Sequence, residues 1–194
     1  MNLFLWGALP YIAFTFLIVG TLVRFFYFER NWTTKSSEFL EKKQLRIANP
    51  LFHFGLLCVI GGHVVGVLVP KAWTAAIGIN DHMYHEGALY MGAVAGIIFI
   101  VGFLLLMKRR FTVPAMKVNT SGLDKWLYLF LTLAIFSGMA GTLLNASGFF
   151  DYRVSIGPWF RSLLSFMPDP SLMEGVPFMF KFHMLAWMVV AIIF

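Results

Sequence analysis

The stretch LFHFGLLCVIGGHVVGVLVP, residues 51–70, decides the fold class of this chain of 194 residues. It contains no Asp, Glu, Lys or Arg, and its length suits an α-helix that crosses the hydrocarbon core of a bilayer. It nevertheless carries two histidines, His53 and His63. An imidazole in lipid needs a hydrogen-bond partner, a water-filled cavity or a metal. The stretch therefore predicts a membrane helix that also carries a function.

The composition of the whole chain agrees with a membrane protein. Hydrophobic residues make up 59% of it, charged residues 12%, and its mean hydropathy is +0.78, which excludes a soluble globular enzyme. The apolar runs are too continuous for barrel strands, so they predict helices. The net charge of +6 is interpreted as a signal of orientation in the membrane and not of nucleic-acid binding. The single cysteine, Cys58, excludes an internal disulfide.

Apolar runs of membrane-spanning length predict an all-α integral membrane bundle of five transmembrane helices, within a single domain over residues 1–194. Eleven of the 15 Lys and Arg residues, counting Arg24 at the end of the first run, lie in or beside the connections after the first and third runs, which places those connections in the cytoplasm and the N-terminus outside. The first run has no cleavage site and is expected to stay as an anchor. The five runs are about Phe4–Tyr27, Leu51–Val69, Gly87–Met107, Trp126–Leu144 and Phe178–Phe194.

The last run and the connection before it have features of their own. The connection between the fourth and fifth runs is rich in aromatic residues with scattered single charges, which is typical of a segment at headgroup depth. The fifth run ends at Phe194 without a basic flank, and it is short for a span. We expect the natural chain to be longer, with this sequence truncated at its C-terminus.

The spacing of His53 and His63 predicts two separate metal centres. On a helix, ten residues correspond to about 15 Å along the axis and to roughly 80° of rotation. One small metal ion cannot span that distance, which argues against a mononuclear zinc or iron site. Two stacked haems could each take one ligand from this helix, and each iron would then need a second histidine from a facing helix.

The orientation of the helices predicts one of the two pairs. The second span runs outward and the fifth runs inward, so His63 and His183 both lie near the outer face and can share one haem. His53 lies near the inner face, and the sequence offers no partner at that depth. We expect that partner beyond Phe194, so that the inner haem lacks its second ligand in this chain.

Two further groups of residues have both a structural and a functional interpretation. Gly55, Gly61, Gly62 and Gly66 could admit a flat macrocycle beside the histidines, or they could serve plain helix packing, with Gly62 and Gly66 as a small-residue pair.

His82 and His85, with Asp81 and Glu86, stand in the outer connection just before the third span. They are either solvated loop residues or a quinol-binding site whose titratable groups accept protons.

These segments together resemble one family, the cytochrome b (gamma) subunit of respiratory membrane-bound nitrate reductase. The resemblance covers essentially all 194 residues. It is carried by WTTKSSEFLEKK (32–43), LFHFGLLCVIGGHVVGVLVP (51–70), HMYHEGALYMG (82–92), LLNASGFFDYRVSIGPWFRSL (143–163) and VPFMFKFHMLAW (176–187). It implies five spans, an outer N-terminus, two b haems with bis-histidine ligation and a quinol site beside the outer haem.

The resemblance also implies roles for residues. His63 and His183 look like the ligands of the outer haem, His53 looks like the first ligand of the inner haem, and Gly62 falls where the quinol pocket meets the outer haem. Some members have a lysine near the start of the third span, where this chain has Tyr84, His85 and Glu86. These three residues are therefore interpreted as quinol-site candidates, with His85 as a possible substitute for the lysine.

The implied function is electron transfer in anaerobic respiration, within a bacterial cytoplasmic membrane. Membrane quinol would be oxidised at the outer side, and its electrons would pass through the two haems to an iron–sulfur beta subunit and then to a molybdenum-containing alpha subunit. The basic inner connections would face that partner or anionic lipid headgroups. The chain has no cysteine cluster and no nitrate site, so we assign it no catalytic residue.

Two alternatives remain open at this point. The first is a di-haem cytochrome b subunit of another quinol-linked oxidoreductase, such as a formate dehydrogenase, a hydrogenase or a sulfur-metabolising complex. The second is a membrane transporter or scaffold without haem, in which the histidines relay protons.

Overall fold

The computed structural model describes residues 2–27 and 41–194, and each regular element in these ranges is a helix. Arg30, Lys35 and most of the WTTKSSEFLEKK motif lie outside the described residues. The elements are, in chain order, η1 (Phe4–Ala8), α1 (Leu9–Tyr27), α2 (Lys43–His63), η3 (Val64–Leu68), α3 (Lys71–Ala76), α4 (Asp81–Thr112), α5 (Pro114–Val118), α6 (Gly122–Leu144), α7 (Ile156–Leu164), η4 (Pro170–Met173) and α8 (Phe178–Ile193). The predicted all-α fold class is confirmed for the described part of the chain.

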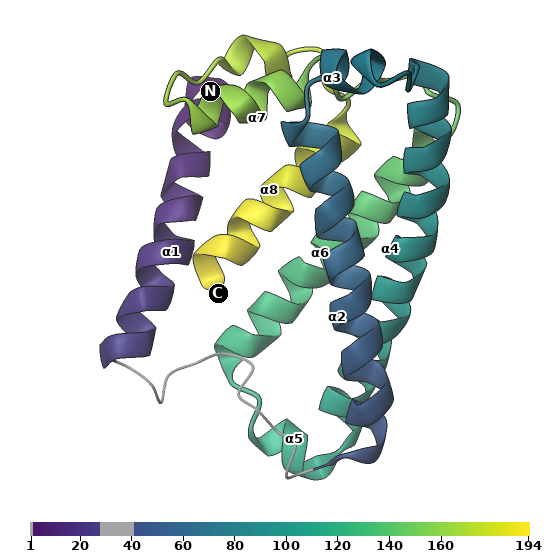
Figure 1. Ribbon diagram of the computed structural model, residues 1–194. Helices are drawn as coiled ribbons and strands as arrows, with labels where there is room; N and C mark the ends of the chain where they lie inside the picture. Colours follow the sequence, from purple (N-terminus) through teal and green to yellow (C-terminus); the bar gives the residue numbers. More distant parts are fainter. Residues whose placement is uncertain (1, 28–40) are drawn as a thin grey trace.

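The helices form a bundle with two distinct ends (Figure 1). The long helices α1, α2 and α4 run along the bundle, while α6 and α8 cross it obliquely. The short helices α3 and α7 cover one end, here called the α7 end, and α5 lies at the opposite end, here called the α5 end. Helix α8 packs against both α6 and α1.

Four of the helices are long and apolar enough to cross a membrane: residues Phe4–Tyr27, Lys43–Leu68, Asp81–Thr112 and Gly122–Leu144. The fifth predicted span, α8, is apolar but has only 16 residues. The described helices therefore support four spans by length. Two of them begin well before the predicted apolar runs, at Lys43 and at Asp81.

Local sequence signals fix the start of the long helices. The side chain of Asn80 accepts a hydrogen bond of 2.9 Å from the Met83 amide and so caps α4. Ser121 and Asp124 form a reciprocal capping box at the start of α6. These caps explain why both helices start in polar sequence, ahead of their apolar segments.

Two glycines allow α2 and α4 to pack backbone to backbone. A Cβ atom on Gly55 would lie 2.5 Å from the backbone nitrogen of Phe99, and one on Gly102 would collide with the backbone of Phe52. Phe99, Phe103 and Ile135 form a buried apolar cluster beside this crossing. The crossing makes α2 and α4 one rigid unit, and it fixes the position of the two histidines on α2.

The connection that was predicted to lie at headgroup depth forms α7 and η4, and part of it is buried in the protein. Trp159 is only 2% exposed, and its Nε1 donates a hydrogen bond of 2.8 Å to the carbonyl of Trp6. The hydroxyl of Tyr11 donates a hydrogen bond of 2.8 Å to the carbonyl of Leu163. The connection therefore closes the α7 end of the bundle over the start of the chain.

Candidate functional site

The rings of His63 and His183 face each other between α2 and α8. Their centres are 5.9 Å apart, and their planes differ by 28°. His63 is the last residue of α2, and His183 lies in the first half of α8. Two helices that are far apart in the sequence thus bring together the two histidines that were predicted to share one centre.

Hydrogen bonds to backbone carbonyls fix the tautomer of both rings. Nδ1 of His63 donates to the carbonyl of Val59 at 2.7 Å, and Nδ1 of His183 donates to the carbonyl of Ala134 at 2.8 Å. Because a carbonyl can only accept, the proton of each neutral ring is on Nδ1, and Nε2 keeps its lone pair. This is the arrangement of a metal-ligating histidine held by a carbonyl behind it.

The separation of the rings fits two axial ligands on one metal. Two metal–nitrogen bonds of about 2 Å, together with about 1 Å from each nitrogen to its ring centre, give roughly 6 Å between ring centres. The described residues contain no group of three or more His, Cys, Asp or Glu side chains that could hold a metal ion. A metal with two protein ligands and a macrocycle, as in a haem, therefore matches this donor set better than a zinc site does.

Helix α6 shapes the back of this site. A Cβ atom on Gly138 would lie 2.7 Å from Cε1 and 3.0 Å from Nδ1 of His183. The hydroxyl of Ser137 lies 3.3 Å from the same Nδ1. Neither of these residues nor Ala134 was predicted as part of the site, although the small residues Ser137, Gly138, Ala140 and Gly141 in the fourth apolar segment were a usable signal.

The four glycines singled out on α2 have different surroundings. Gly55 serves the α2–α4 crossing, and a Cβ atom on Gly66 would lie 3.0 Å from the Tyr152 ring. Gly61 and Gly62 have open space at the Cβ position, with nothing within 4 Å. Helix packing therefore explains Gly55 but not Gly62, and the space beside His63 stays open.

His53 shows the same local pattern without a facing histidine. Its Nδ1 donates to the carbonyl of Asn49 at 2.9 Å, so its Nε2 also keeps the lone pair. Its ring contacts the ring of Phe52. The other four histidines lie elsewhere: further along α2, at the start of α4 and on α8. In the described structure His53 therefore has a free Nε2 lone pair and no facing histidine.

The predicted quinol-site residues lie on the first turns of α4, and not in a loop as the sequence analysis stated for His82 and His85. His85 Nε2 donates to the carbonyl of Ala146 at 3.1 Å, so this ring is turned toward the end of α6. The Tyr84 hydroxyl points the other way, 3.2 Å from the position of a Cβ atom on Gly66. Of these residues, Tyr84 therefore comes within about one turn of His63.

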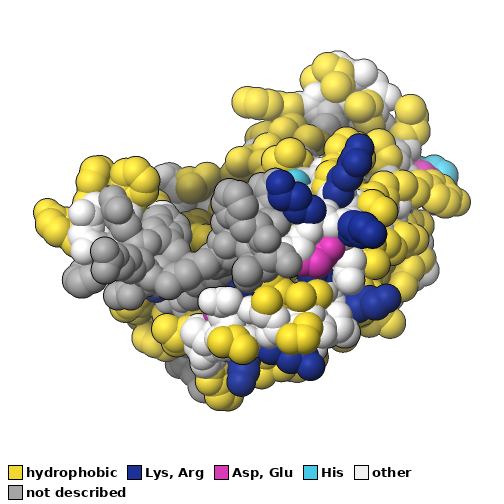
Figure 2. Space-filling model, turned by 90° about the horizontal axis from the view of Figure 1, so that it is seen from below, with side chains coloured by type: hydrophobic (Ala, Val, Ile, Leu, Met, Phe, Trp, Pro, Cys, Tyr) yellow, Lys and Arg dark blue, Asp and Glu magenta, His cyan; other side chains and the backbone are white. Residues whose placement is uncertain are grey.

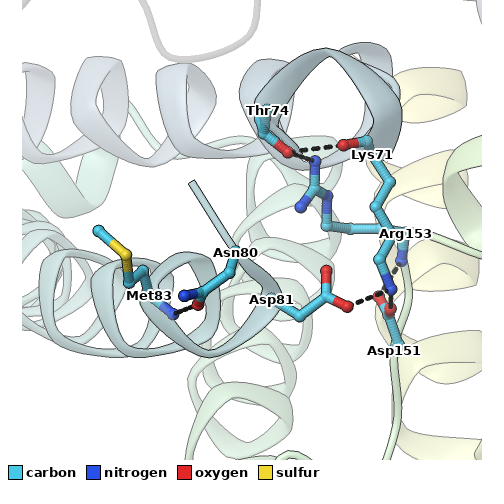
Figure 3. Close-up of polar contacts among 7 residues, drawn as sticks. All are labelled: Lys71, Thr74, Asn80, Asp81, Met83, Asp151 and Arg153. Atoms are coloured by element: carbon cyan, nitrogen blue, oxygen red, sulfur yellow. Dashed lines mark hydrogen bonds and ion pairs between the residues drawn. The ribbon is translucent and has the colours of Figure 1, made fainter. Parts of the chain in front are cut away.

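A polar network joins α3, α4 and the loop before α7 (Figure 3). Lys71 lies 2.8 Å from Asp81 and 3.0 Å from Asp151, and both carboxylates raise the pKa of its ammonium group. Arg153 donates to the Thr74 hydroxyl at 2.7 Å. The pKa of the Tyr152 hydroxyl is raised, mainly by burial and then by a hydrogen bond with Tyr84. The network ties α3, the start of α4 and the loop before α7 together at the α7 end of the bundle.

The α5 end carries buried ion pairs that the sequence analysis did not predict. Arg109 lies 2.8 Å from the carboxylate of Glu41, and Arg110 lies 3.7 Å from that of Asp124. Hydrogen bonds, the largest from the Gln44 amide, lower the pKa of Glu41. These two arginines were counted among the basic residues of the inner connections, but they are nearly buried and belong to the packing of the bundle.

Comparison with known proteins identifies the family. The family model described as nitrate reductase gamma subunit matches residues 2–194. This chain belongs to that family. It is similar to the nitrate reductase gamma chain of Bacillus subtilis, with 46% identity over 190 residues that cover 97% of this chain and 85% of the relative. The resemblance to this family that the sequence analysis stated is confirmed.

More distant relatives of this gamma subunit agree. The respiratory nitrate reductase 1 gamma chain of Escherichia coli is 27% identical over 196 residues, which cover all of this chain and 87% of the relative. The nitrate reductase-like protein NarX of Mycobacterium tuberculosis is 38% identical over 183 residues, which cover 93% of this chain but 28% of that protein. As a member of the family, the gamma subunit described here is a membrane cytochrome b subunit of an oxidoreductase.

Proposed function

We propose that this gamma subunit takes electrons from membrane quinol at the α7 end and passes them, through two b haems, to an iron–sulfur beta subunit at the α5 end. The beta subunit would deliver them to a molybdenum-containing alpha subunit that reduces nitrate. The observation that carries the proposal is the opposed pair of His63 and His183, each with its Nδ1 committed to a backbone carbonyl.

The residues of the chain divide the work in this proposal. His63 and His183 hold the haem near the α7 end, and His53 holds one side of the haem nearer the α5 end. When bound, haem supplies one-electron redox chemistry whose potential depends on axial ligands, burial and hydrogen bonds. The carbonyls of Val59 and Ala134 keep the two ligand rings in register.

The distribution of charge supports a direction across a bacterial cytoplasmic membrane. Figure 2 looks onto the α5 end and shows Lys and Arg side chains gathered there among apolar ones. Basic residues on the elements of this end include Lys43, Lys108, Lys117 and Lys125. By the positive-inside rule, this charge supports a cytoplasmic α5 end even without the buried Arg109 and Arg110. The proposal thus has five spans, with α8 as the fifth and the N-terminus outside.

Quinol would bind beside His63, in the open space at Gly62 and near the hydroxyl of Tyr84. The hydroxyl of Tyr84 is the closest candidate for a hydrogen bond to a quinol oxygen. His85 and Glu86 lie on the next positions of α4 and would carry protons toward the outer surface. Protons would thus leave at the α7 end, while electrons pass toward the α5 end.

A spectrum of the membrane complex tests the proposal. The reduced-minus-oxidised difference spectrum is expected to show b-type bands. His63→Ala should remove the haem held by His63 and His183, which is the haem beside the quinol site, and should abolish reduction of the cytochrome by quinol. Met91→Ala, a change of an exposed side chain on α4 to which the proposal gives no role, is the control and should keep both. If the unchanged complex shows no b-type bands, the proposal is wrong.

A further inference from the structure

The guanidinium of Arg153 is buried and incompletely paired at the α7 end. The residue is 5% exposed, and its Nη2 donates to the Thr74 hydroxyl at 2.7 Å. Its Nε and Nη1 are buried and have no hydrogen-bond partner among the described residues. Its central carbon lies 3.7 Å from the centre of the Tyr84 ring, so the guanidinium is stacked on that ring.

The carboxylates near Arg153 are already engaged with another cation. Asp151 and Asp81 both pair with Lys71, and Asp151 additionally accepts a hydrogen bond of 2.9 Å from the backbone amide of Arg153. No described carboxylate forms an ion pair with the guanidinium itself. Arginine stays charged at any physiological pH, and a buried charge without a counter-ion is strongly unfavourable. The site therefore calls for an anion.

The position of Arg153 indicates which anion this is. The ring on which it stacks, Tyr84, has its hydroxyl against Gly66, and Gly66 follows His63 by three residues. The guanidinium thus reaches Gly66, about one turn beyond His63, through the Tyr84 ring, and it lies toward the α7 end. Quinol carries no charge at neutral pH and so cannot neutralise it. A b haem carries two carboxylates on one edge.

We propose that Arg153 is a positioning residue that pairs with a propionate carboxylate of the haem held by His63 and His183. This inference rests on the proposed function, because it requires a haem at that pair. The pairing would orient the macrocycle about the axis through its two ligands. Thr74 holds the guanidinium in place from the other side.

Esterified haem tests the pairing without any change to the Arg153 site. The complex is produced in a host that cannot make haem, with His53→Ala present so that only the outer site is filled, and is loaded with protohaem or with its dimethyl ester. The parent should bind the ester about tenfold more weakly, which is the loss expected for one charge-assisted hydrogen bond. Arg153→Gln should bind both equally, and Arg153→Lys should keep part of the preference.

The control and the redox readout separate this pairing from other roles. Lys181→Gln removes a cation on the first turn of α8 whose ammonium group donates to the carbonyl of Glu174, and it should keep the full preference for protohaem. Arg153→Gln should also lower the midpoint potential of the outer haem, because a nearby cation favours the reduced form. In this variant the midpoint potential should also vary with pH over the range in which the propionate titrates.

Each remaining result has a defined meaning. A parent that binds both haems equally, or an Arg153→Gln variant that keeps the preference, overturns the inference. So does a variant with unchanged haem affinity and potential and only a raised KM for quinol, because Arg153 would then serve the quinol. If Arg153→Gln fails to accumulate, the parent measurement with the ester still decides. If no b haem binds the parent at all, the proposed function fails and not this inference alone.

Discussion

Replacing Gly138 by alanine is the sharpest test of how the outer site is built. The added Cβ atom would lie 2.7 Å from Cε1 of His183, which is closer than real Cβ atoms come to other atoms. The ring can escape only by turning away from α6, and then it loses the hydrogen bond of 2.8 Å from Nδ1 to the carbonyl of Ala134. The substitution therefore perturbs the direction in which Nε2 points without replacing His183 itself.

The size of the effect follows from two known costs. Overpacking a tight site costs about 1–3 kcal/mol, and losing the hydrogen bond adds about 1 kcal/mol. If half or more of this free-energy cost destabilises the haem-bound state relative to the haem-free state, the affinity of the His63–His183 site for haem falls roughly tenfold or more. Haem content per complex and the optical redox titration of the b bands measure this loss directly.

A matched glycine provides the control. Gly92 also lies in the middle of a long helix, and a Cβ atom there would meet nothing within 4 Å. Gly92→Ala should keep both haems and slightly raise stability, because alanine favours helices by about 1 kcal/mol over glycine. If Gly138→Ala keeps its outer haem with unchanged affinity and potential, His183 is not held against α6 and the reasoning is refuted.

Three further predictions concern the frame around the site. Gly55→Val should prevent assembly of the complex, because its Cβ would collide with the backbone of Phe99. The amount of assembled complex in the membrane, measured on a blue native gel, should fall. Normal assembly would contradict the α2–α4 crossing. Arg161→Gln should lower the thermal midpoint by removing a hydrogen bond of 2.7 Å to the Val67 carbonyl, worth about 1.5–3 kcal/mol, and an unchanged midpoint would show that η3 needs no such support. The pKa of Glu41 is lowered in the folded protein, so this residue stabilises the fold above its ordinary pKa of about 4.3, and the stabilisation is lost as the pH falls through the folded pKa. Glu41→Gln should therefore make the free energy of unfolding depend less on pH in the acid range. An unchanged pH dependence would argue against the pairing with Arg109.

The sequence predicted the helices well and their ends poorly. Hydropathy locates the part of a helix that lies in lipid, but the backbone hydrogen bonds continue into the polar region. Helix α2 accordingly begins at Lys43 and not near Leu51, and α4 begins at Asp81, directly after its Asn80 cap, and not near Gly87. The caps were visible as residue types, but capping depends on backbone geometry that hydropathy does not report.

The facing of His63 and His183 could be predicted because it depends only on depth and direction. The end of an outward-running span and the start of an inward-running span lie at the same depth in the membrane. Two histidines at these positions can therefore face each other whenever the two helices are neighbours. The neighbours of the pair were not predictable in that way. Gly138 and Ala134 contribute because α6 packs against α8, and Arg153 contributes because a loop folds back over α4, so both depend on which elements become adjacent.

The carbonyl that accepts from Nδ1 comes from a different place for His183 than for His53 and His63. His53 and His63 each donate to the carbonyl four residues earlier on α2, so helix formation alone selects their ligating tautomer. His183 donates to the carbonyl of Ala134 on α6 and gains its orientation only when α8 docks. We therefore expect α2 to present its ligands before the bundle is complete, and α8 to close the outer site last. A disturbance between α6 and α8 should release the outer haem while His53 stays ready to bind.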